Sequence, residues 1–147
     1  MAKDVSVPDR VFLDAAYAIA LSSPADQFHA AAAALAEWLE ASGARLVTTP
    51  AVLLEIGNAL ARPRHRRAAA QLLNSLCADP TVEIVPFSDQ LFDQALKLFS
   101  TRQDKEWGLT DCLSFVVMEE RSISQALTTD EHFQQAGFRV LLREPVP

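Results

Sequence analysis

Short apolar runs alternate with longer segments of helical spacing along this chain. The runs are rich in Val, Ile and Leu, and each is bounded by Pro, Gly or polar residues; they cover 11–13, 45–48, 82–85, 125–128 and 138–142. Runs of this length are typical of buried strands in a parallel sheet. The pattern predicts the order β-α-α-β-α-α-β-α-α-β-α-β. Such alternation indicates an α/β fold, a three-layer α/β/α sandwich with a central, mainly parallel sheet.

Helix starts and ends in the first half are marked by Pro and Gly. Ser23 followed by Pro24, and Thr49 followed by Pro50, each place a capping side chain before a Pro at the first helical position. They predict helices that begin at Pro24 and Pro50. Gly43 ends the first of these helices, because Gly readily adopts the left-handed conformation found after a helix.

The second half contains three further boundary signals. Pro63 separates the helix that begins at Pro50 from a following amphipathic helix over 68–77. Ser88 is the expected cap of the next helix. Thr110 is the expected cap of a mostly apolar helix with its body at 112–118.

Length and composition are those of an ordinary globular domain. The chain has 147 residues, of which 50% are hydrophobic and 22% charged, so we expect a single domain over 1–147 with its core at about 10–143 and a loose C-terminal tail. No apolar run is long enough to cross a bilayer, and the first ten residues lack the apolar h-region of a signal peptide. Cys77 and Cys112 form no CxxC pattern, which favours buried thiols in a reducing cytoplasm.

The net charge argues against broad electrostatic binding of nucleic acid. It is −6, from 13 basic and 19 acidic residues, whereas proteins that coat nucleic acid are usually basic. A local basic patch is still compatible with this balance, since Arg62, Arg64, Arg66 and Arg67 lie within six positions. Such a run is usually a solvated face, and the alternative is an arm that contacts RNA phosphates.

Four acidic residues lie at places where parallel strands and their helices present ligands. Asp14 and Asp130 follow predicted strands, Asp111 opens a helix, and Glu55 interrupts an apolar helical segment. The carboxyl ends of parallel strands meet at one edge of a sheet, where ligands bind in open α/β folds. We therefore expect at least three of these carboxylates to converge.

Each acid has an ordinary structural explanation when it is taken alone. Asp111 favours the positive end of a helix, Asp130 could cap the helix at 131–136, Asp14 could form a turn, and Glu55 could lie on a polar helix edge. Together they predict a cation site, because carboxylates about 4 Å apart repel by about 4 kcal/mol per pair. Oxygen ligands select Mg²⁺ or Mn²⁺, which suits phosphodiester hydrolysis. His132 is expected to be structural rather than a base.

The segments around these acids occur in a distinctive order. They are V-F-L-D-A-A-Y at 11–17, T-P-A-V-L-L-E-I-G-N-A-L at 49–60, D-K-E-W-G-L-T-D-C-L-S-F at 104–115 and A-L-T-T-D-E-H-F-Q-Q-A-G-F at 126–138. In this order they resemble the PIN-domain ribonucleases of the VapC-type toxin group, over about 11–142. Gly108 departs from the family, whose members often have Ser between Trp and Leu.

The resemblance implies roles for the acids. Asp14 and Asp111 would be direct ligands of Mg²⁺ or Mn²⁺, with Asp130 close by or acting through water. Glu55 would orient the attacking water or hold the ion through water, and Asp104 would be an accessory acid. Thr110 or Thr128 would add a hydroxyl near the site.

The resemblance also implies a substrate and partners. The protein would be an endoribonuclease acting on tRNA, rRNA or mRNA, blocked by a cognate antitoxin, commonly a homodimer, and without a membrane partner, in a prokaryotic cytoplasm. A catalytically inactive PIN-fold module that binds RNA or protein is the alternative. Two other classes fit less well. A phospho-accepting receiver would need a late Lys, and none follows Lys105; an aspartyl phosphatase would need a second Asp where Ala16 stands.

Overall fold

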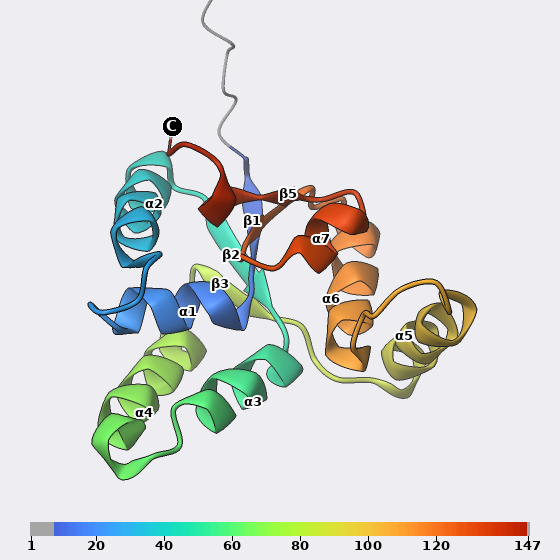
Figure 1. The fold of residues 1–147 in the computed structure, drawn as a ribbon, viewed down its shortest axis with the longest axis horizontal. Coiled ribbons are helices and arrows are strands. Elements are labelled where there is room, and N and C mark those ends of the chain that lie inside the picture. The colour runs from blue at the N-terminus through green and yellow to red at the C-terminus, as the bar shows by residue number, and fades with distance from the viewer. Residues whose placement is uncertain (1–7, 147) are drawn as a thin grey trace, which may run out of the picture.

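A five-stranded parallel sheet forms the centre of the molecule in the computed structural model, which describes residues 8–146 (Figure 1). Its strands are β1 (Arg10–Leu13), β2 (Arg45–Thr48), β3 (Val82–Ile84), β4 (Gln125–Leu127) and β5 (Arg139–Val140). Their order is β3-β2-β1-β4-β5, and every neighbouring pair is parallel. The predicted three-layer α/β/α class is confirmed. Residues 1–7, in which no h-region was expected, and residue 147, the end of the expected tail, lie outside the described part.

The helices follow the predicted order. They are α1 (Ala15–Ser22), α2 (His29–Ser42), α3 (Pro50–Ala59), α4 (Pro63–Ala78), α5 (Asp89–Thr101), α6 (Leu109–Glu120) and α7 (Glu131–Gln135), followed by a 3-10 turn at Leu141–Arg143. The expected boundaries at Pro50, Pro63 and Ser88 are confirmed, and Gly43 ends α2 with a φ of 71°. None of the helices in the described residues has the length and apolar character needed to span a membrane.

The two faces of the sheet are covered by different helices. Side chains alternate along a strand, so Phe12 points to one face while Val11 and Leu13 point to the other. Phe12 belongs to a core cluster with residues of α3, α5, α6 and α7, whereas Val11 and Leu13 belong to a cluster with α1 and α2. Figure 1 shows α2 and α7 on opposite sides of β1.

Several predicted element boundaries were wrong. The helix expected over 68–77 already begins at Pro63. The second helix begins at His29 rather than Pro24, because two turns intervene: Asp26 N–H donates to the Ser23 carbonyl, and the Asp26 carboxylate accepts from Phe28 N–H at 2.8 Å. The last strand was expected over 138–142. It pairs only at β5 and then tightens into the 3-10 turn, which buries Leu141 against the α1–α2 face.

The arrangement of β1 and β4 positions the acidic residues. The two strands are neighbours at the centre of the sheet, and the connections that leave them run to opposite halves of the sheet. Ligands of doubly wound sheets bind at such a point, beyond the carboxyl ends of the strands. Leu13 pairs with Leu127, so Asp14 and Thr128 leave the sheet side by side.

Candidate active site

Asp14 is the most buried of the four predicted acids. It follows β1 directly, and only 8% of the residue is exposed. Burial raises the pKa of Asp14 to about 6, and the charges of Asp111 and Asp130 raise it too, against the opposing hydrogen bond from Thr128. The carboxylate is therefore held in a place that penalises its charge.

Thr128 links two of the acids. Its hydroxyl donates to Asp14 Oδ2 at 2.7 Å and accepts from the Asp130 backbone N–H at 3.0 Å. The residue is fully buried, so neither bond competes with solvent. Of the two threonines that the family resemblance offered, Thr128 holds the ends of β1 and β4 in register with each other.

Asp111 enters the site from the first turn of α6. The helix is capped by Gly108 rather than by Thr110 as predicted, because the Asp111 carboxylate itself accepts from the Gly108 N–H at 3.0 Å. The same oxygen, Oδ2, lies 3.1 Å from His132 Nδ1. Thr110 instead lies near Glu55 and lowers the pKa of that carboxyl group. The acid thus satisfies one free N–H of its own helix end and still faces the site.

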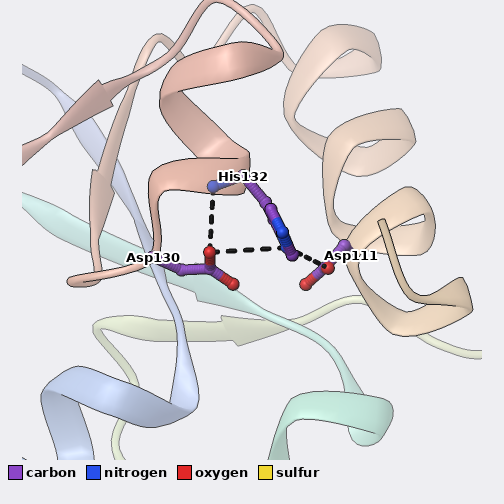
Figure 2. Close-up of side chains that lie close together, drawn as sticks. All are labelled: Asp111, Asp130 and His132. Atoms are coloured by element: carbon purple, nitrogen blue, oxygen red, sulfur yellow. Dashed lines mark hydrogen bonds and ion pairs between the residues drawn. The ribbon is translucent and has the colours of Figure 1, made fainter. Parts of the chain in front are cut away.

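His132 lies between Asp111 and Asp130 (Figure 2). Its Nδ1 is 3.1 Å from Asp111 Oδ2 and 3.5 Å from Asp130 Oδ1, and its backbone N–H donates to Asp130 Oδ1 at 2.9 Å. Both atoms that face Nδ1 are carboxylate oxygens, so this geometry favours a hydrogen on Nδ1 that is donated to them. Asp130 does cap α7, yet it also belongs to the acidic group: one ligand atom from each of the three residues lies within 4.8 Å of the others.

Glu55 approaches from α3. The residue as a whole is exposed, but desolvation of its carboxyl group and then the charges of Asp14 and Asp111 raise the pKa of Glu55 to about 7, against the opposing effect of Thr110. Because the charge of Asp14 raises the pKa of Glu55, the Glu55 side chain on α3 must lie near the end of β1. All four predicted acids are therefore electrostatically coupled in one place.

The coupled acids have no basic partner of the kind that usually neutralises such a group. In residues 8–146, no Lys or Arg forms an ion pair with Asp14, Glu55, Asp111 or Asp130. Carboxylates brought together without a cation repel one another, and this repulsion contributes to the raised pKa values of Asp14 and Glu55. Oxygen donors in this state fit a hard divalent ion, so these acids could hold one.

The structure does not bring the remaining candidates into the cluster. Asp104 pairs with Arg102 at 2.9 Å and with Lys105 at 3.9 Å on an exposed loop, and the Arg102 hydrogen bond lowers the pKa of Asp104. The basic cluster Arg62, Arg64, Arg66 and Arg67 is exposed at and within the start of α4. It lies past the far end of α3, the helix that carries Glu55 (Figure 1).

Known proteins share both the sequence pattern and the fold of this chain. The family model of the PIN domain matches residues 11–139. Among solved structures, the crystal structure of VapC20 from Mycobacterium tuberculosis, described as a sarcin–ricin loop cleaving toxin, matches with a TM-score of 0.76 and 28% sequence identity. The match covers 87% of this chain and 95% of that chain. The search of curated proteins found no match.

Proposed function

Because the chain belongs to the PIN-domain family, we propose that it is a divalent-metal-dependent endoribonuclease, the toxin of a toxin–antitoxin pair. The observation that carries the proposal is the coupling of Asp14, Glu55, Asp111 and Asp130 at the carboxyl edge of the sheet, where no Lys or Arg of residues 8–146 pairs with them. The structural likeness to VapC20, a sarcin–ricin loop cleaving toxin by its description, supports RNA as the substrate.

The acids divide the work in this proposal. Asp14, Asp111 and Asp130 would hold Mg²⁺ or Mn²⁺, which when bound would supply stabilisation of negative charge on the phosphate and would favour ionisation of water. Glu55, open to solvent on α3, accepts the proton of the attacking water. Its pKa of about 7 suits that role, since a general base works best near the ambient pH. Thr128 and His132 hold the carboxylates in place through their hydrogen bonds.

A direct test is incubation of the protein with total cellular RNA, followed by mapping of the new RNA ends. We expect discrete cuts with Mg²⁺ or Mn²⁺, and loss of cutting in EDTA that is restored by excess Mg²⁺. Cleavage that continues at full rate in EDTA would contradict the proposal. Absence of both cleavage and divalent binding would favour the alternative, an inactive module that binds RNA or protein. No feature of the described site favours that alternative.

The basic cluster extends the proposal to substrate binding. The four Arg side chains of 62–67 are exposed and offer guanidinium groups suited to phosphate oxygens, beyond the helix that carries Glu55. We expect Arg64→Glu and Arg67→Glu to weaken RNA binding uniformly across sequences. For single-stranded RNA, the plot of the logarithm of the association constant against the logarithm of the salt concentration has a negative slope. Its magnitude should decrease by about 0.7 for each Arg–phosphate pair that a substitution removes. Equal slopes in wild type and variants would show that the cluster is a solvated face.

Regulation and assembly are further parts of the proposal. A VapC-type toxin would be blocked by a cognate antitoxin and would form a homodimer, and residues 1–147 would act as one nuclease domain in the cytoplasm. The two cysteines are free thiols, which is compatible with a reducing compartment. Cys112 is buried as expected, whereas the expectation of a buried Cys77 was wrong, because Cys77 is exposed on α4. Co-purification from the native host, with the mass of the complex measured in solution, tests both partner predictions.

A further inference from the structure

Buried polar side chains are few in the described part of the chain. Five polar or charged residues are buried in the described part of the chain, and all are at the carboxyl edge of the sheet or on α6: Asp14, Thr48, Thr49, Thr128 and Ser114. Thr128 bonds Asp14, the Thr48 hydroxyl donates to the Leu13 carbonyl at 2.8 Å, and Thr49 accepts from Val52 N–H at 3.3 Å. Among the described residues, only the hydroxyl of Ser114 is buried with no partner.

Ser114 differs from three other hydroxyl residues in the helices of this protein, Ser22, Ser100 and Thr101. Ser22 donates to the Ala18 carbonyl at 2.8 Å, Ser100 to Leu96 at 2.7 Å and Thr101 to Lys97 at 2.9 Å. A bond to the carbonyl four residues earlier is the usual way in which such a hydroxyl is satisfied inside a helix. Ser114 does not make it, although α6 is regular there, so its hydroxyl is aimed elsewhere.

The position of Ser114 on α6 indicates the direction in which its hydroxyl points. Ser114 follows Asp111 by three residues, which places the two side chains on the same face of the helix, and helical side chains lean toward the N-terminal end. Asp14 lies two residues after Phe12, which packs in the same core cluster as α6. Side-chain alternation then directs Asp14 toward α6 as well. We therefore expect the Ser114 hydroxyl to lie on the side of α6 that faces the carboxylates of Asp14 and Asp111.

We propose that Ser114 is a positioning residue of the acidic cluster, whose hydroxyl donates through one buried water to the carboxylate of Asp14. Buried polar groups without a protein partner are commonly satisfied by such a water, which needs at least two polar partners of its own. With Thr128 on its other side, the Asp14 carboxylate is then fixed from both directions. The proposal rests on the proposed function, since it assigns Ser114 to the binding of a divalent ion by this site.

The test measures binding of Mn²⁺ alone, from the electron paramagnetic resonance signal of free Mn²⁺, in wild type, Ser114→Ala and Ser100→Ala. Loss of a residue that positions a metal ligand typically weakens metal affinity by about 10-fold or more, and we expect that for Ser114→Ala. Ser100→Ala, which removes an exposed helical hydroxyl on α5, should bind as wild type does. The Mn²⁺ concentration for half-maximal RNA cleavage should rise in parallel, while the rate at saturating Mn²⁺ recovers.

The outcomes separate this inference from the proposed function. If wild type fails to bind Mn²⁺, the proposed function is wrong. If wild type binds Mn²⁺ and Ser114→Ala binds it equally well, with only a rise in thermal stability, the hydroxyl is an unsatisfied group of the core and the inference is overturned. A high-resolution crystal structure provides a second measurement, because an ordered water between Ser114 Oγ and Asp14 is expected, and direct packing of apolar atoms in its place would overturn the inference.

Discussion

Asp14→Asn and Asp111→Asn variants will cleave RNA about 10³-fold more slowly than wild type, a loss of about 4 kcal/mol in transition-state stabilisation. Each change keeps the shape of the side chain but removes one negative charge from the group that would hold the ion. In Asp14→Asn the new amide carbonyl can still accept from Thr128, and in Asp111→Asn it can still accept from Gly108 N–H, so the local hydrogen bonds survive. The measurement is single-turnover cleavage of a mapped RNA at saturating Mg²⁺.

Asp9→Asn is the matched control for these variants. Asp9 is exposed and precedes β1, so the substitution makes the same chemical change at the opposite end of the strand that delivers Asp14. It should cleave as wild type does, and all three variants should keep the wild-type circular dichroism spectrum. A folded Asp14→Asn protein that retains full cleavage would remove Asp14 from the catalytic machinery.

The fold could be predicted because each element carries a local signal that agrees with its neighbours. The five apolar runs are too short for helices, Thr49 and Ser88 make the caps that their side chains predict, and Pro50 takes the first helical position. The failure at Pro24 has a local cause as well. Ser23 and Pro24 do start a turn, but the Asp26 carboxylate accepts a hydrogen bond from the Phe28 N–H, and the helix begins only at His29. A competing cap of that kind is visible only once the chain is folded.

The acidic group could be predicted in outline but not in its connections. Strand ends and helix starts placed Asp14, Asp111 and Asp130 at one edge of the sheet without any knowledge of distances. His132 was expected to be structural, and no sequence pattern indicated that the His132 ring would point toward Asp111, 21 residues away. The one available signal was its spacing of two residues from Asp130. The Thr128 bond to Asp14 spans 114 residues and depends on strand register, which sequence patterns do not fix.

Without divalent ions, the protein will become less stable as the pH rises from about 4 to about 7. The pKa of Asp14 is raised from 3.8 to about 6, so between these values the folded state holds a proton that the unfolded state has released. This proton stabilises the folded state fully below the unfolded-state pKa, and the stabilisation is lost as the pH rises through the folded-state pKa. The loss in the free energy of unfolding is about 3 kcal/mol, from about 1.4 kcal/mol for each unit of difference between the two pKa values. Glu55, with a pKa of about 7, acts in the same direction, and solvent screening makes its share smaller.

Urea unfolding in EDTA at a series of pH values measures this dependence. At pH 7.5 the Asp14→Asn variant should be more stable than wild type by up to about 3 kcal/mol, because it replaces a desolvated charge with a neutral amide, and its pH dependence should be flatter. Saturating Mg²⁺ should stabilise wild type far more than the variant, since only the folded wild-type site gains a cation for its four carboxylates. A wild-type protein whose metal-free stability rises between pH 4 and 7 would show that these acids are neutralised within the protein itself, and the case for an ion at this site would then fail.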